Sequence, residues 1–226
     1  MDQSFGRLDR GQFSRIRAWS AASLPMSVHA AEVVWYPFGG PVVLYPAALF
    51  PQARQLLLTG LEPVGAPPSA ADFAGADGEG SLAELRQSLG TLLGKSFFVT
   101  AQMQQQFARN RFRGVTPVLM LLLARAGFQI DSATAVVLSA DGRLCARAFA
   151  DRVDNAGVVI GYHGSDGVER RLSYLRVDLS DQGLQAMPGY ALLVQRFGVQ
   201  VSYLKSASYL LHTAGFSQIR ALLLAQ

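Results

Sequence analysis

The chain has 226 residues, of which 50% are apolar and 16% are charged, and its net charge is +4. Intrinsic disorder is excluded because it requires few apolar residues and a high charge density. Cys145 is the only cysteine, so an internal disulfide is excluded as well. The composition predicts one compact globular domain over residues 1–226.

The N-terminal part of the chain predicts a helical extension and then a strand–helix–strand unit. Residues 1–30 are polar and Arg-rich, and Asp9 is placed to cap a short helix there. The elements that follow are a buried strand (32–38), a Gly-Gly-Pro turn (39–41), a short helix (42–50) and a second buried strand (55–61).

The middle of the chain predicts a long loop followed by helices. Residues 64–80 are rich in Gly, Pro, Ala and Asp, which favours a flexible loop, either a lid or a plain excursion of the chain. Helices are predicted over residues 81–93, 98–112 and 116–126, and Gly127 ends the last of them.

From about residue 133 the apolar residues recur with a period of two, which is typical of strands. The dipeptides Asp141-Gly142 and Asp166-Gly167 are typical of tight β-hairpin turns. The predicted elements are four strands (135–138, 144–149, 157–162 and 170–178), a helix (183–197), a strand (200–204) and a last helix (208–224).

Together these elements predict an α/β fold, a three-layer Rossmann-like domain with a mixed sheet. The strand–helix–strand units at both ends of the chain imply parallel strands joined by right-handed crossovers. The hairpins between them imply antiparallel strands in the same sheet. Ligands of such folds bind in a crevice at the carboxyl ends of the parallel strands, so a site is expected there.

The turn after the first strand is one candidate for ligand binding. Gly39 and Gly40 would let the backbone approach a ligand closely, and the helix that follows presents free N–H groups. Glu62 stands at the end of the second strand, where a carboxylate can bind a ribose. We therefore predict Tyr36, Gly39, Gly40 and Glu62 as cofactor-binding residues. The alternative is that the two glycines only form a tight turn.

A second candidate is the junction between the last strand and the last helix. Lys205, Ser206 and Ser208 would lie at the rim of the sheet, beside the positive end of a helix, which favours an anion. They are the candidate catalytic residues, and Lys205 could act as a base. The alternative is that a serine caps the helix and Lys205 is solvated.

Several kinds of function find no support in the sequence. No metal site is predicted, because His29, His163 and His212 lie far apart without ligand spacing and the common catalytic motifs are missing. The net charge is too small to indicate nucleic acid, so no nucleic-acid partner is expected. The longest aliphatic run, Val118 to Ala124, is far shorter than the roughly 20 residues that span a bilayer, so no transmembrane segment is predicted.

The compartment is left open. Residues 1–17 carry charges and no apolar stretch, so no signal peptide is predicted. An exported or periplasmic origin stays possible if the chain is trimmed. The high apolar fraction with few charges favours a large interface, so a homo-oligomer or a protein partner is expected beside a small-molecule ligand.

The spacing of the Gly39-Gly40 turn and Glu62 resembles the opening unit of class I S-adenosylmethionine-dependent methyltransferases. This resemblance implies S-adenosylmethionine as the cofactor, with the glycines beside it and Glu62 on its ribose. The chain departs from that family where Tyr36, Pro37 and Phe38 stand in place of the usual acidic residue.

Two longer strings resemble a family of uncharacterised bacterial proteins. They are Trp35-Tyr-Pro-Phe-Gly-Gly-Pro41 with Leu61-Glu-Pro-Val-Gly65, and Tyr203-Leu-Lys-Ser-Ala-Ser-Tyr-Leu-Leu-His212 with Phe216-Ser-Gln-Ile-Arg220. The resemblance covers the chain from about Trp19 onward and implies no particular activity. It implies a further acidic segment beyond Gln226, so a truncated C-terminus stays open, and it is compatible with export.

Three functions are therefore in view, and whether the protein is an enzyme is undetermined. The first is binding of a small anionic or nucleotide-like ligand at the carboxyl ends of the strands. The second is methyl transfer from S-adenosylmethionine. The third is a non-catalytic interaction module that assembles through an apolar surface.

Overall fold

The structure, a computed structural model, describes residues 2–69, 80, 114–149, 156–205 and 208–225. The helices predicted over residues 81–93 and 98–112 lie outside the described residues, as do residues 70–79 of the predicted loop. Residues 64–69 of that loop form no helix or strand.

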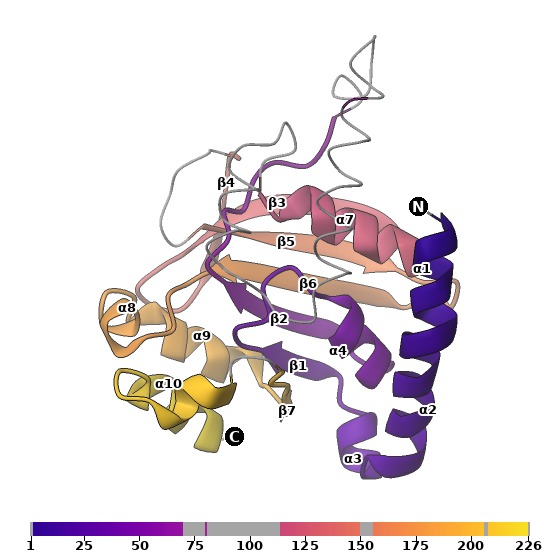
Figure 1. Ribbon diagram of the computed structural model, residues 1–226. Helices are drawn as coiled ribbons and strands as arrows, with labels where there is room; N and C mark the ends of the chain where they lie inside the picture. Colours follow the sequence, from indigo (N-terminus) through magenta and orange to yellow (C-terminus); the bar gives the residue numbers. More distant parts are fainter. Residues whose placement is uncertain (1, 70–79, 81–113, 150–155, 206–207, 226) are drawn as a thin grey trace.

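A seven-stranded mixed sheet is the centre of the described structure, with strand order β4-β3-β5-β6-β2-β1-β7 (Figure 1). Strands β7, β1, β2 and β6 run parallel to one another, and β6, β5, β3 and β4 are antiparallel. The predicted mixed sheet is therefore confirmed. The strands are β1 (Val33–Tyr36), β2 (Gln55–Gly60), β3 (Gln129–Leu138), β4 (Leu144–Arg147), β5 (Ala156–His163), β6 (Glu169–Arg176) and β7 (Val201–Ser202).

Helices lie on both faces of the sheet, which makes the fold the predicted three-layer α/β arrangement (Figure 1). The first layer holds α1 (Asp2–Leu8), the π-helix η1 (Asp9–Phe13), α2 (Ser14–Ser23), α3 (Met26–His29), α4 (Leu44–Leu49) and α7 (Thr116–Arg125). The other layer holds α8 (Asp181–Gln185), α9 (Gly189–Phe197), the 3-10 helix η3 (Ser208–His212) and α10 (Ser217–Leu224).

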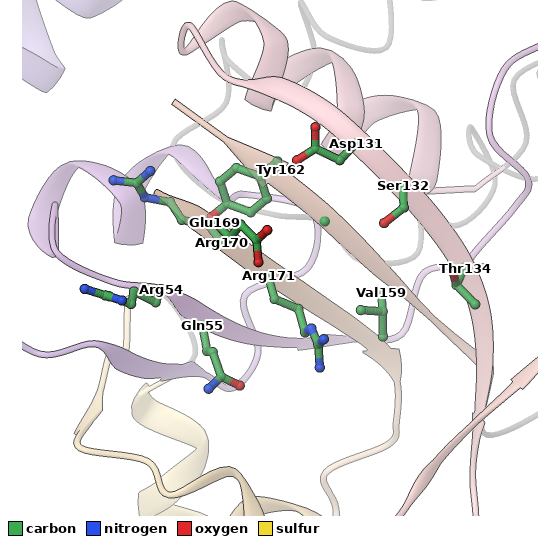
Figure 2. A pocket seen from close by; sticks show the side chains of 11 residues that line it. Arg54, Gln55, Asp131, Ser132, Thr134, Val159, Tyr162, Glu169, Arg170 and Arg171 are labelled. Carbon is green, nitrogen blue, oxygen red and sulfur yellow. The ribbon is translucent and has the colours of Figure 1, made fainter. Parts of the chain in front are cut away.

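The second helical layer packs on only part of its face of the sheet. Its apolar side chains, such as Tyr190 and Leu193, bury Trp35 and Leu57. Farther along the same face, polar side chains such as those of Gln55 and Arg171 project from the strands (Figure 2). This face is therefore apolar under the helices and polar beyond them.

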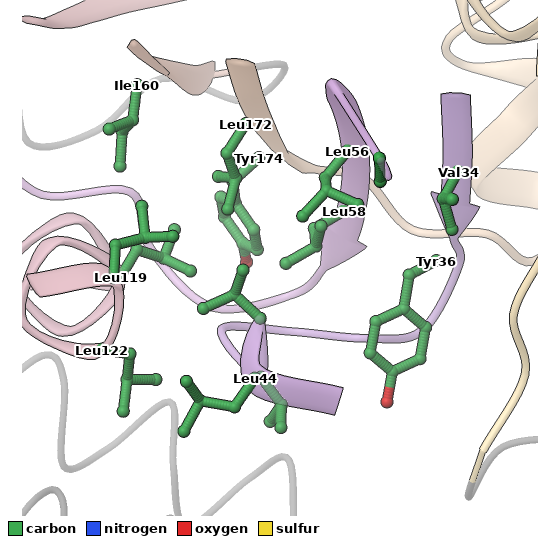
Figure 3. Close-up of a cluster of buried hydrophobic side chains, with 14 of the residues drawn as sticks. Val34, Tyr36, Leu44, Leu56, Leu58, Leu119, Leu122, Ile160, Leu172 and Tyr174 are labelled. Atoms are coloured by element: carbon green, nitrogen blue, oxygen red, sulfur yellow. The ribbon is translucent and has the colours of Figure 1, made fainter. Parts of the chain in front are cut away.

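The core divides into two clusters because side chains alternate along each strand. In β1, Val34 and Tyr36 point to the α4–α7 layer, whereas Trp35 points to the α9 layer (Figure 3). In β2, Leu56 and Leu58 face the first layer and Leu57 faces the second. Because both faces of β1 and of residues 56–58 in β2 are covered, these segments are continuous apolar runs, as is typical of parallel strands.

The predicted turns are confirmed. Gly142 lies between β3 and β4 with a φ of 78°, and Gly167 lies between β5 and β6 with a φ of 68°. Gly127 follows α7 with a φ of 89°, the left-handed conformation expected of a glycine that ends a helix. Among the described residues, no helix is long and apolar enough to cross a membrane.

Other expectations were wrong in detail. Asp9 caps no helix, because the chain is already helical from Asp2, and its carboxylate binds Arg17 at 2.9 Å instead. The helix predicted over 183–197 is two helices, α8 and α9, with Pro188 directly before α9, where the absence of its N–H costs nothing. The helix predicted over 208–224 is likewise divided, into η3 and α10.

The predicted strand ends also shift. Strand β3 begins at Gln129, six residues before the predicted start, and its first part carries exposed polar residues that hide the strand pattern. Strands β4 and β6 each end two residues earlier than predicted, and β7 is limited to Val201–Ser202.

Candidate functional site

The carboxyl ends of four parallel strands meet at one edge of the sheet, where ligands of α/β folds bind. Strand β1 ends at Tyr36, β2 at Gly60, β6 at Arg176 and β7 at Ser202. The segments that leave these strands bring five of the predicted site residues to this edge: Tyr36, Gly39, Gly40, Glu62 and Lys205. Of the other two, Ser206 lies outside the described residues, and Ser208 is exposed at the start of η3.

Glu62 is held inside this edge rather than presented at its surface. Its side chain is only 3% exposed, and the hydroxyl of Tyr174 lies 3.1 Å from its Oε2. The same hydroxyl lies 2.9 Å from the carbonyl oxygen of Glu62. Burial raises the pKa of the Glu62 carboxyl group, against smaller opposing effects of hydrogen bonds from the backbone and Tyr174. The carboxyl group is thus directed into the protein, toward Gly40, Gly60 and Tyr174.

The glycines of the turn make room for protein side chains. A Cβ atom at Gly39 would lie 2.5 Å from the ring of Tyr36, and one at Gly40 would lie 3.3 Å from both carboxyl oxygens of Glu62. Gly40 has a φ of 51°, and its N–H donates to the carbonyl of Thr59 at 3.1 Å, so the turn is joined to the end of β2. The space left by the glycines is thus occupied by Tyr36 and Glu62.

A cluster of tyrosines lies on the β7 side of this turn. The rings of Tyr36 and Tyr203 have centroids 4.7 Å apart, and Tyr203 also packs edge-on against Phe50. Tyr45, from α4, contributes its ring, and its hydroxyl accepts a hydrogen bond from Gln12 at 2.9 Å. Burial raises the pKa of Tyr203 to about 12 and raises that of Tyr36 further, so both phenols stay protonated and able to donate.

Lys205 lies against this tyrosine cluster, with its Nζ 3.5 Å from the centroid of the Tyr45 ring. A cation over a tyrosine face is attracted by the ring quadrupole. Among the described residues, no carboxylate forms an ion pair with Lys205. An ammonium group has three donors, and the aromatic face satisfies none of them as a hydrogen bond. The site therefore offers a cation and phenolic donors at one edge of the sheet.

The sequence did not identify several residues of this edge. Tyr45, Tyr174 and Tyr203 come from a helix, a central strand and the segment after β7, and only the fold brings them together. Tyr190 was also missed; its hydroxyl accepts from the Trp35 indole at 3.0 Å and lies 2.6 Å from Thr59 Oγ1, below the same strand ends. Tyr203 alone carried a local signal, because it stands two residues before Lys205.

A search of the described residues finds no group of three His, Cys, Asp or Glu side chains arranged to hold a metal ion. Comparison with protein-family models, with curated proteins and with solved structures gives no match. The two resemblances given above therefore stay predictions, and a functional assignment depends on the geometry of the chain itself.

Proposed function

We propose that this protein binds a small anionic ligand at the carboxyl ends of β7 and β1, with Lys205 as its principal cation. The observation that supports the proposal is the position of Lys205 Nζ, which lies on the Tyr45 ring without a carboxylate partner among the described residues. Tyr36 and Tyr203, whose rings pack on each other, supply the phenolic groups of the same aromatic cluster. Phosphate and carboxylate groups are the ligands that such donors prefer.

The surroundings of Glu62 favour anion binding over methyl transfer. Its carboxyl group is enclosed by Gly40, Gly60 and Tyr174, which leaves it out of reach of a cofactor ribose in this conformation. Because burial raises its pKa, Glu62 also opposes an anion less than a surface carboxylate would. Glu62 is thus a positioning residue that fixes the turn.

Calorimetric titration with pyrophosphate, AMP and S-adenosylmethionine tests the proposal. We expect saturable binding of at least one of the two phosphate compounds, weakened roughly 10- to 100-fold by Lys205→Ala, since a hydrogen bond to a charged group contributes about 1.5–3 kcal/mol. Arg143→Ala is the matched control, because it removes one cation from the exposed β3–β4 turn. Binding equally weakened by both substitutions, or no binding at all, contradicts the proposal.

An interaction module is the second candidate, and exposed apolar side chains favour it. Leu192, Tyr209 and Leu224 are 42%, 64% and 81% exposed, and all three belong to the α8–α10 side of the molecule. Exposed apolar surface of this kind is typical of protein interfaces. Light scattering at increasing concentration checks this candidate: self-association that Leu192→Glu abolishes supports it, and a monomer at all concentrations argues against self-assembly.

A further inference from the structure

The face of the sheet that the α8–α10 layer leaves uncovered carries a second group of polar side chains. Gln55, Arg171, Gly161 and Ser132 are neighbours in register across β2, β6, β5 and β3. Residues paired in this way share one face of the sheet. Gln55 is the first residue of β2, so this row lies at the end of the strand opposite to Glu62.

This row forms part of a hollow of about 660 Å³. Its floor continues into the next row of the sheet, where Val159 pairs with Thr134. Gly161 leaves space between Arg171 and Ser132, because it has no side chain. Figure 2 shows Arg171 extending along this floor, toward the space between Gln55 and Val159 and away from Glu169.

Arg171 is the lining cation that remains available. Of the other two lining arginines, Arg54 binds Glu32 at 3.2 Å and Arg170 binds Asp166 at 2.6 Å. Arg171 is exposed and forms no ion pair within the described residues. A guanidinium group presents donors in a planar fork that matches a carboxylate or phosphate.

The lining carboxylates limit where an anion can lie. Asp131 is engaged by the ring of His163 at 2.8 Å. Glu169 has no cation partner among the described residues, and it precedes Arg171 by two positions on β6. An anion is therefore favoured on the Gln55 side of Arg171, where the Gln55 amide adds a neutral donor. The hydroxyls of Ser132 and Thr134 lie on the other side of Arg171, across β5, and line the rest of the hollow.

Ser173 lies next to the hollow without lining it. It follows Arg171 by two residues on the same face of β6, and its neighbour in register, Val159, lines the hollow. Ser173 is 1% exposed, and its Oγ is the one buried side-chain polar atom of the described residues without a hydrogen-bond partner. Because this hydroxyl is enclosed and does not line the hollow, it is not a contact for a ligand bound there.

We propose that this hollow is a second ligand site, for a small organic anion whose carboxylate or phosphate pairs with Arg171 beside Gln55 and whose hydroxyl groups extend over Gly161 toward Ser132 and Thr134. The site uses none of the residues that carry the proposed function, and it lies at the other end of the parallel strands. Each of the two sites can therefore exist without the other.

The test is calorimetric titration of the full chain with glucuronate, glucose 6-phosphate and neutral glucose. The first two probes distinguish a carboxylate from a phosphate ligand, and glucose tests the need for a charge. We expect one anion to bind and its affinity to fall at least about tenfold in Arg171→Gln. Arg143→Gln, with the same change of charge on an exposed turn, should leave the affinity unchanged. Lys205→Ala should also leave it unchanged.

A second variant removes the hollow without altering charge. The backbone of Gly161 is that of an ordinary strand residue. Among the described residues, a Cβ there would meet Ser132 alone, its rotatable hydroxyl at 2.7 Å and its Cβ at 3.9 Å. Gly161→Val should therefore fold and lose binding. The proposal is overturned if neither anion binds, if glucose binds as tightly as the anions, or if Arg171→Gln and Gly161→Val bind like the wild type.

Discussion

The hydroxyl of Tyr174 lies within hydrogen-bond distance of both the carbonyl oxygen and the carboxyl group of Glu62, at 2.9 and 3.1 Å. This contact joins the central strand β6 to the residue that follows the end of β2. Tyr174 is fully buried, and burial together with the neighbouring carboxyl group raises its pKa well above the usual value. The phenol is therefore a permanent donor that fixes the chain at the candidate site.

Tyr174→Phe removes this donor and leaves two buried oxygens of Glu62 with fewer partners. An orphaned buried polar group costs about 1–3 kcal/mol, so we expect the free energy of unfolding to fall by about that amount. Urea unfolding measures it. Tyr209→Phe is the control, because Tyr209 is 64% exposed, and its substitution should change stability by less than about 0.5 kcal/mol. Equal effects of the two substitutions would contradict the structural role of Tyr174.

Glu62 predicts a pH dependence of stability with a definite sign. Its pKa in the folded protein is raised above the ordinary value of 4.5, so the folded state favours the protonated carboxyl group. Its contribution to stability is complete below about pH 4.5 and is lost as the pH rises through the raised pKa. The stability of the wild type relative to Glu62→Gln should therefore fall as the pH increases from 4.5 to 8.

Asp181 supplies a control with the opposite sign. Hydrogen bonds from the backbone of Gln218 and from Ser217 lower its pKa below the ordinary 3.8. The contribution of Asp181 is therefore present above that pH and lost as the pH falls through the lowered pKa. The stability of the wild type relative to Asp181→Asn, measured by urea unfolding, should therefore fall as the pH decreases below 3.8, opposite in direction to the change for Glu62→Gln above pH 4.5. If the stability difference between the wild type and Glu62→Gln does not change with pH, the Glu62 carboxyl group titrates alike in the folded and unfolded chains.

Alanine substitutions at Gly40 and Gly198 distinguish the cost of backbone strain from the cost of contact with a neighbouring side chain. Gly40 and Gly198 have φ values of 51° and 65°, so alanine at either costs about 1–2 kcal/mol of backbone strain. A Cβ at Gly198 meets no atom of the described residues within 4 Å, whereas one at Gly40 meets both carboxyl oxygens of Glu62 at 3.3 Å. We expect Gly40→Ala to destabilise the protein more than Gly198→Ala does, in thermal or urea unfolding. This additional loss of stability at Gly40 should be smaller when Glu62 is also replaced by alanine. If it is unchanged, contact with the Glu62 carboxyl group is not its cause.

The unit from β1 to β2 could be predicted from the sequence because its signals are local. Continuous apolar residues form β1 and β2, Pro37 follows the first strand, and Gly39 and Gly40 form the turn. The hairpin turns at Gly142 and Gly167 were equally clear, since a positive φ at that position favours glycine. These features depend on neighbours in the sequence and were confirmed.

The expectations that failed depend on contacts between distant segments. The first part of β3 is polar because the second helical layer does not cover its face, so it lacks the apolar alternation of a half-buried strand. Asp9 had the spacing of a helix cap, but the helix beginning at Asp2 runs past it. A local sequence pattern does not show which part of the sheet the second helical layer leaves uncovered. It also does not show whether an earlier helix continues past a possible cap residue.

For the same reason, only some residues of the candidate site could be predicted from the sequence. Glu62 and Lys205 follow predicted strands and Tyr36 lies near the end of another, so the fold rule for parallel sheets placed them at one edge. Tyr174, which fixes Glu62, is 112 positions away in the chain. Arg171 gave no sequence signal at all, because its availability depends on Arg54 and Arg170 being paired elsewhere.

A buried network on the other side of the sheet offers the sharpest test of the packing. The hydroxyl of Tyr190 accepts from the Trp35 indole at 3.0 Å and lies 2.6 Å from Thr59 Oγ1, so Tyr190→Phe leaves two buried polar groups unpaired. For each of these unpaired groups that water does not reach, we expect the free energy of unfolding to fall by about 1–3 kcal/mol, as measured by urea unfolding.

The partner Thr59 makes this prediction specific to the hydrogen bond. In the wild type, Thr59→Val breaks a pair, whereas in the Tyr190→Phe background it removes a hydroxyl that has already lost its partner. Replacing both members of a hydrogen-bonded pair by apolar groups costs less than the sum of the single losses. Thr59→Val should therefore cost at least about 1 kcal/mol less in the Tyr190→Phe background than in the wild type. If its cost is the same in both, the two hydroxyls are not coupled, and the hydrogen bond from the Trp35 indole is the polar contact left to Tyr190 in this network.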